Sequence, residues 1–127
     1  MNIILDTHSF IWFINGDNNL SAKARKEIEN PANINFISIA SIWEMAIKVS
    51  LDRLEIMRPF EDIKNQIDNN GFEILPILFE HTLKLTNLTF HHRDPFDRLI
   101  IAQSVVEKMP IISKDKLFDK YKVKRIW

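Results

Sequence analysis

Cysteine is absent from this chain of 127 residues, and glycine occurs only twice, at Gly16 and Gly71. Without cysteine, neither a disulfide framework nor a thiolate metal site is possible. No basic segment followed by a long apolar run stands at the N-terminus, and no uncharged apolar stretch reaches the length of a membrane span. These absences lead us to expect a soluble, cytoplasmic protein without a membrane partner.

A surplus of charge of either sign is also lacking, because 17 basic residues balance 17 acidic ones. Tight, non-specific nucleic-acid binders usually carry a basic surplus, so the balance argues mildly against that class. It leaves a nuclease open, since acids that hold a metal ion can be offset by bases elsewhere. The length suits one core, and we expect residues 1–127 to form a single domain.

Short β-rich runs alternate with helical stretches, which predicts an α/β fold with a mainly parallel sheet of four to five strands. The predicted strands span residues 2–5, 34–37, 72–75, 110–112 and 123–127. The predicted helices span residues 8–14, 22–30 (with Ser21 as the N-cap), 40–51, 59–70, 79–87 and 95–108. The helix at 8–14 is apolar on almost every side, which indicates either full burial or contact with another chain.

Four acids fall near one edge of this predicted sheet. Asp6 follows the first strand and Asp115 follows the fourth, at the carboxyl ends where open α/β sheets bind ligands. Glu44 and Asp97 lie early in helices that should face the same edge. Clustered carboxylates without cysteine suit a hard cation such as Mg²⁺ better than zinc. Asp6, Glu44, Asp97 and Asp115 are therefore the candidate catalytic and metal-binding residues.

Three of these acids also have structural interpretations. Ser41 and Glu44 have the spacing of a helix capping box. Asp97 stands in the first turn of its helix, where the helix dipole favours a carboxylate. Asp115 fits an ordinary polar turn. Asp6 is the hardest to explain structurally, because it lies between two apolar segments and a buried carboxylate needs a partner or a metal.

Several other charged residues and histidines lie near these four acids in the sequence. Asp94, directly before a proline, is interpreted as a helix N-cap and not as a fifth member of the site. His8 directly follows Asp6 and Thr7 and is the best candidate among the histidines for a role at the site. His91 and His92 lie in a polar loop, where solvation or substrate contact is the commoner role. Four bases have positions suited to phosphate contact, although solvated surface charge is more common: Lys48, Arg93, Arg98 and Lys114.

The segments around the four acids resemble the four motifs of PIN domains. Residues 2–8 resemble the opening strand, and residues 38–48, 92–103 and 111–118 resemble the second, third and fourth acidic motifs. Their order and spacing fit a PIN domain over essentially the whole chain. All four acidic positions of the family are filled, and Ser113 matches a position usually held by Ser or Thr.

This resemblance implies a three-layer α/β/α sandwich around a parallel sheet. Small, single-domain members from bacteria and archaea are commonly VapC-type toxins of toxin–antitoxin pairs. The resemblance therefore implies an endoribonuclease that depends on Mg²⁺ or Mn²⁺ and hydrolyses RNA with metal-activated water. It further implies a homodimer that is inhibited by a small antitoxin protein.

Three alternatives stay open from the residues alone. The chain can be a catalytically inactive module that binds RNA or protein, or a nuclease directed at DNA. It can also be a phosphoryl-transfer enzyme or receiver domain with Asp6 as the nucleophile. The haloacid-dehalogenase pattern needs a second acid two residues later, where His8 stands. A receiver domain needs paired acids early and its phosphorylated Asp later.

Overall fold

The computed structural model of the chain describes residues 1–54, 56 and 58–127. Its five strands form one sheet in the order β3-β2-β1-β4-β5, and each neighbouring pair is parallel. The strands are β1 (Asn2–Leu5), β2 (Ile34–Ser38), β3 (Glu73–Leu75), β4 (Ile111–Ile112) and β5 (Arg125–Ile126). The predicted parallel sheet is confirmed, and no strand extends more than one residue beyond its predicted bounds.

Six α-helices and one 3₁₀ helix occur among the described residues. They are α1 (Thr7–Asn15), α2 (Ala22–Glu29), α3 (Ile39–Ser50), α4 (Asp62–Asn69), α5 (Phe79–Thr86), α6 (Pro95–Glu107) and the 3₁₀ helix η1 (Lys116–Lys120). The helix η1 was not predicted, and among the predicted helices the largest departure is α4, which begins three residues later than Pro59. There the backbone N–H groups of Asp62 and Ile63 donate to carbonyls three residues earlier, so a tight turn precedes the helix.

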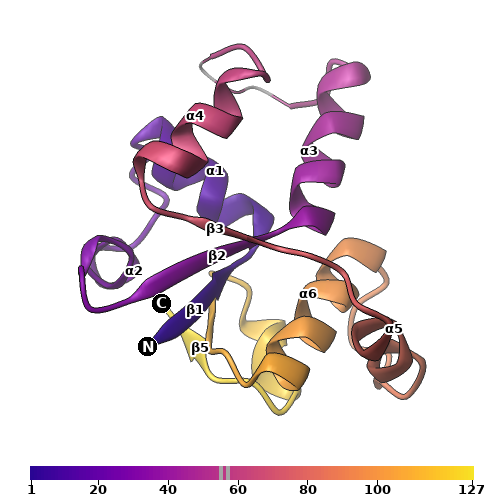
Figure 1. The fold of residues 1–127 in the computed structure, drawn as a ribbon. Helices are drawn as coiled ribbons and strands as arrows, with labels where there is room; N and C mark the ends of the chain where they lie inside the picture. Colours follow the sequence, from indigo (N-terminus) through magenta and orange to yellow (C-terminus); the bar gives the residue numbers. More distant parts are fainter. Residues whose placement is uncertain (55, 57) are drawn as a thin grey trace.

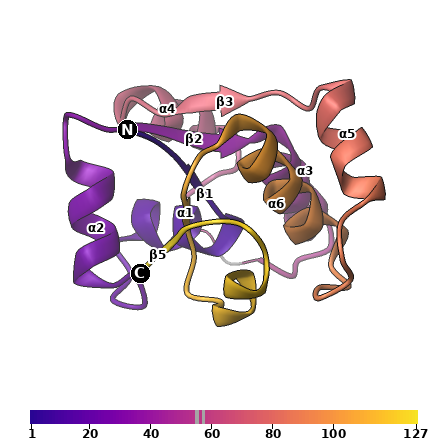
Figure 2. The same ribbon diagram turned by 90° about the horizontal axis from the view of Figure 1, so that it is seen from below.

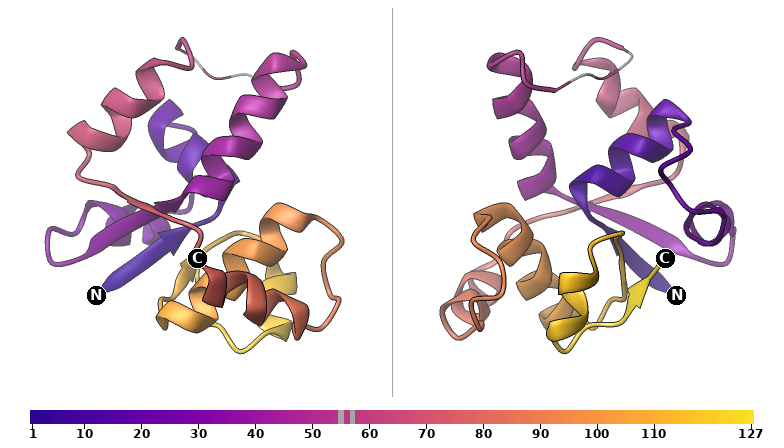
Figure 3. Two further views of the ribbon diagram at one scale, coloured as in Figure 1. Left: turned by 45° about the vertical axis from the view of Figure 1, so that its right-hand side comes forward. Right: turned by 180° about the vertical axis from the view of Figure 1, so that it is seen from behind.

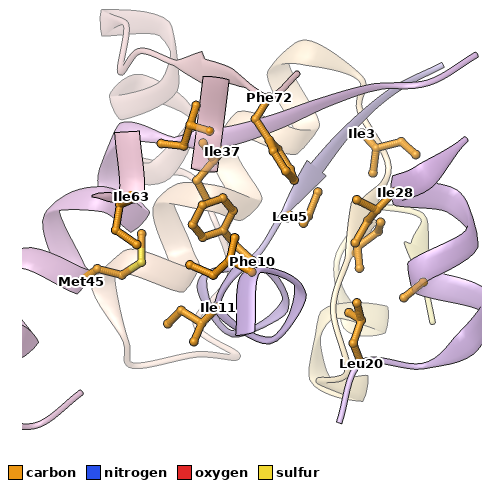
Figure 4. Close-up of a cluster of buried hydrophobic side chains, with 14 of the residues drawn as sticks. Ile3, Leu5, Phe10, Ile11, Leu20, Ile28, Ile37, Met45, Ile63 and Phe72 are labelled. Atoms are coloured by element: carbon orange, nitrogen blue, oxygen red, sulfur yellow. The ribbon is translucent and has the colours of Figure 1, made fainter. Parts of the chain in front are cut away.

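Two apolar clusters lie on opposite faces of the sheet. Helices lie on both sides of the sheet, which confirms the three-layer α/β/α architecture (Figures 1 and 3). Successive residues of a strand face opposite sides. Ile3 and Leu5 therefore join residues of α1, α2, α3 and α4 in one cluster (Figure 4). Ile4 joins residues of α6 and η1 in the other. Helices α2 and α5 lie at opposite ends of the molecule (Figure 2).

Helix α1 contributes most of its apolar side chains to the hydrophobic core. Phe10, Ile11 and Ile14 are buried in the first cluster, and Trp12 packs against Trp127 with ring centroids 5.9 Å apart. Of the two interpretations of this helix, burial within the same chain accounts for most of its apolar surface. None of the described helices combines the length and the apolar character that crossing a membrane requires.

Candidate metal centre

Asp6 lies at the carboxyl end of β1, where the chain leaves the sheet and enters α1. Its Oδ1 accepts the backbone N–H of Ser9 at 2.8 Å, so Asp6 is the N-cap of α1. The side chain is buried, and burial raises the pKa of its carboxyl above the ordinary value. Hydrogen bonds from Ser113 and Ser9 oppose that rise. Asp6 is thus a buried acid held in place by short polar contacts.

Glu44 is a buried residue of α3, and its two carboxylate oxygens have different partners. The Thr7 hydroxyl donates to Oε1 at 2.7 Å and contacts the Ser41 hydroxyl at 2.9 Å. The Lys48 ammonium donates to Oε2 at 2.7 Å. The alternative interpretation of Ser41 and Glu44 as a capping box is wrong, because Ser38 and not Ser41 caps α3. Glu44 instead points from the second turn of the helix towards the start of α1.

Asp97 stands in the first turn of α6, which Asp94 caps through hydrogen bonds from two backbone N–H groups. The N-cap interpretation of Asp94 is confirmed. Burial is the main reason that the pKa of Asp97 is raised from 3.8 to about 7, and the negative charges of four neighbouring acids raise it further. In order of effect these are Asp94, Asp6, Glu44 and Asp115. All four predicted acids therefore share one electrostatic environment.

Asp115 follows β4 on the exposed side of this group and is the N-cap of η1. Its Oδ1 accepts the backbone N–H of Leu117 at 2.9 Å, and its Oδ2 lies 2.8 Å from Nε2 of His92. One potential ligand atom from each of His92, Asp97 and Asp115 lies within 4.8 Å of the other two. Two of the four predicted acids, Asp97 and Asp115, therefore lie close together. The third member of this group is His92, which lies in a polar stretch of the sequence.

A pocket of about 290 Å³ opens beside the acids. It is lined by Asp6, Asp115, His8, Trp12 and Lys114. His8 is exposed at this pocket, and Lys114 lies over the Trp12 ring with Nζ 5.8 Å from its centroid. The pocket gives a solvent-accessible approach to the acidic group from the side of α1.

Arg98 does not fit the proposed role in phosphate contact. Its side chain is buried, and its guanidinium donates to the backbone carbonyls of Thr89 and Leu88, each at 3.1 Å. The ring of Phe90 stacks on the guanidinium at 3.8 Å. Arg98 therefore holds the segment that leads into α6. Lys48 pairs with Glu44, which leaves Arg93 and Lys114 as the exposed bases of the predicted four.

The residues that sequence reasoning missed are the polar partners of the acids. Thr7 and Ser41 contact Glu44 or each other, and Tyr121 contacts His92. His92 is 7% exposed, so its interpretation as a solvated loop residue was wrong. The spacing of His92 before Asp97 is a weak signal for its place in the cluster. The contact with Tyr121 has no local signal, because it joins distant parts of the chain.

The fold and this cluster define an α/β protein with carboxylates gathered at the carboxyl edge of a parallel sheet. The family model of the PIN domain matches residues 3–124. The chain belongs to the PIN domain family, as the resemblance of its four motifs implied. Comparison with curated proteins finds no match to this chain.

Three solved structures resemble the chain in fold. VapBC2 from Rickettsia felis, bound to a DNA fragment from its promoter, has a TM-score of 0.71 and 16% identity, with all of both chains covered. A toxin–antitoxin complex from Klebsiella pneumoniae has a TM-score of 0.64 and 17% identity over 94% of this chain and 92% of that chain. FitAcB from Neisseria gonorrhoeae has a TM-score of 0.61 and 15% identity over 97% and 95%.

Proposed function

We propose that the chain is a divalent-metal-dependent endoribonuclease and the toxin of a toxin–antitoxin pair. The observation that carries this proposal is the environment of Asp97, whose pKa is raised to about 7 by burial and by neighbouring acids. Strongly perturbed groups of this kind are concentrated at functional sites. A cation that binds among these acids would offset both the burial of the charge and the repulsion.

The donor set fits Mg²⁺ or Mn²⁺. Carboxylate oxygens suit these hard cations, and the only imidazole in the close cluster of described residues belongs to His92. We assign Asp6 and Asp97 as direct ligands. Glu44 and Asp115 bind the ion directly or hold its water molecules. Lys48 shares the Glu44 carboxylate, which limits how much of that acid is free for a cation.

The proposed chemistry is hydrolysis of a phosphodiester bond. A bound divalent cation supplies positive charge for the phosphate and lowers the pKa of water. The chain contributes the fixed positions of the acids: Ser9 and Ser113 orient Asp6, and Thr7 orients Glu44. The pocket that Asp6 and Asp115 line admits substrate from solvent. Without a cation, the same acids would repel a phosphodiester.

The choice of RNA and of a toxin role is supported by family membership and by the neighbouring folds. The three structures described above are, by name, VapBC2, a toxin–antitoxin complex and FitAcB. We therefore propose a small antitoxin protein as the partner. Growth arrest on expression of the chain, and rescue by co-expression of the adjacent open reading frame, would test that role.

We also propose that the chain forms a homodimer. Five large apolar side chains are exposed on β3, on the segment after it and on α5: Ile74, Ile77, Leu78, Phe79 and Leu83. Phe79 is 76% exposed and Leu83 is 54% exposed, which is costly for a surface without a partner. These exposed side chains, and not α1, are the better candidates for contact between copies.

An RNA cleavage assay with and without Mg²⁺ or Mn²⁺ tests the reaction. Wild type should cleave only with metal, and Asp6→Asn and Asp97→Asn should each lose cleavage. Asp119→Asn is the matched control, because Asp119 is an exposed acid paired with Arg125 outside the cluster. Undiminished cleavage by both folded site variants would overturn the assignment. Cleavage of DNA but not RNA would select the DNA-directed alternative.

A further inference from the structure

The side chain of His92 is fixed by contacts with two aromatic rings and by polar contacts at both ring nitrogens. Its ring contacts those of Phe118 and Tyr121, with centroid distances of 4.7 and 5.5 Å. Both ring nitrogens have polar partners: Nδ1 is 3.0 Å from the Tyr121 hydroxyl, and Nε2 is 2.8 Å from Asp115 Oδ2. The histidine therefore connects a buried phenol to an acid of the candidate metal centre.

The partners of the two ring nitrogens, Tyr121 and Asp115, agree on which nitrogen of His92 carries the proton. The backbone N–H groups of His91 and His92 both donate to the Tyr121 oxygen, at 3.2 and 2.9 Å, and that of His91 is shared with the Thr89 carbonyl at 3.1 Å. With its accepting capacity used by two N–H groups, the phenol has its own O–H left to donate to Nδ1. Nδ1 then accepts, so the proton of the neutral ring resides on Nε2. The Nε2–H group in turn donates to Asp115.

Asp115 needs such a partner because its side chain is 44% exposed. A carboxylate at that exposure samples several rotamers unless hydrogen bonds fix it. Leu117 N–H holds Oδ1, and His92 is the side chain that holds Oδ2. With both oxygens fixed, the carboxylate is kept within reach of Asp97 in the 4.8 Å cluster. A pre-oriented ligand or water-holding group loses less freedom when a cation binds.

We propose that His92 is a positioning residue that fixes the Asp115 carboxylate, and that Tyr121 and Asp115 together select its Nε2–H tautomer. The consequence for metal binding and cleavage rests on the proposed function, whereas the tautomer does not. His92 acts in this account through Asp115 and does not bind the cation itself. The variants described below distinguish positioning of Asp115 from direct binding of the cation by His92.

The tautomer is read directly in the metal-free protein by long-range ¹H–¹⁵N NMR spectra of the histidine rings at pH 8. We expect wild-type His92 to show the pattern of a single Nε2–H tautomer. In Tyr121→Phe the Asp115 carboxylate still accepts from Nε2–H and should keep this tautomer, whereas Tyr121→Phe combined with Asp115→Ala should let the ring average between tautomers. An Nδ1–H or doubly protonated ring in wild type would overturn the proposal, whether or not the Tyr121 variant folds.

A matched pair of substitutions tests the effect on the site. The amide nitrogen of His92→Gln reaches about as far as Nε2 and can donate to Asp115, whereas that of His92→Asn reaches only about as far as Nδ1. In Mn²⁺ calorimetry, His92→Asn should bind roughly tenfold or more weakly than wild type, and His92→Gln within about threefold. His81→Asn is the control, because it removes a buried histidine that contacts a carboxylate, Glu107, outside the cluster. With RNA, His92→Asn should lose kcat and keep KM, and His92→Gln should restore kcat.

Two results would contradict this role. Wild-type Mn²⁺ affinity in His92→Asn would show that the contact with Asp115 does not matter. Equal losses in His92→Asn and His92→Gln would indicate direct ligation or simple packing. A wild-type protein that binds Mn²⁺ but does not cleave RNA would overturn the proposed function and leave the affinity comparison valid, so the two failures are distinguishable.

Discussion

Asp97→Asn should stabilise the metal-free protein while it removes a ligand of the proposed metal centre. The pKa of Asp97 is raised from 3.8 to about 7, first by burial and then by the acids around it. The folded protein therefore binds this proton more tightly than the unfolded chain does. Between about pH 4 and pH 7 the free energy of unfolding falls as pH rises, and above pH 7 the whole penalty is present. A neutral side chain of the same shape removes it.

The size of this gain follows from the shift. Roughly three pKa units at about 1.4 kcal/mol each give an upper limit of about 4 kcal/mol. Asp97 is only partly buried, so solvent screening lowers that value. The lost interaction with the dipole of α6 costs about 0.3–1 kcal/mol. We expect a net gain of about 1–3 kcal/mol at pH 8, which for a chain of this size raises Tm by roughly 4–12 °C.

Thermal unfolding followed by circular dichroism, with a chelator present, measures this gain. At pH 8 Asp97→Asn should melt above wild type, and near pH 4.5 the difference should disappear because wild-type Asp97 is then protonated. Asp119→Asn removes an exposed acid outside the cluster and should show no such gain. The reasoning is refuted if Asp97→Asn melts at or below wild type at pH 8, or if its gain persists at low pH.

Three further results are expected. Mn²⁺ affinity should rise about tenfold per pH unit up to about pH 7 and then level off, with proton release visible in calorimetry, because Asp97 must ionise to bind; a flat profile would count against this. Lys48→Met should lower Tm in chelator yet strengthen Mn²⁺ binding severalfold, since it leaves Glu44 without its ion-pair partner; weaker binding would be inconsistent. Phe79→Asp should convert a dimer into a monomer in light scattering; a dimer that persists in this variant would show that another surface joins the copies.

The sheet could be predicted because each strand has a recognisable local sequence pattern. Buried parallel strands are short apolar runs between helical segments, and those at residues 2–5 and 34–38 are of this kind. The sheet topology then places Asp6 and Asp115 at a common edge. The start of α4 was less predictable, because the turn at Pro59 and a regular first helical turn have similar local sequences.

The polar contacts within the site were beyond prediction. Glu44 has capping-box spacing from Ser41, and only the approach of Thr7 from α1 shows why it is buried and hydrogen-bonded elsewhere. His92 sits in a polar sequence, and its burial depends on Tyr121, far along the chain. Such contacts are set by tertiary packing, whereas the acids themselves are marked by their places at strand and helix ends.

Calorimetric titration of Mn²⁺ into the metal-free protein at pH 8 tests most directly whether the gathered carboxylates form a metal centre. The account predicts saturable binding to wild type and to Asp119→Asn. It predicts that Asp97→Asn and Asp6→Asn bind at least roughly tenfold more weakly, because each lacks an ionised ligand. No binding to wild type, or wild-type affinity in the folded Asp97→Asn and Asp6→Asn variants, would contradict it.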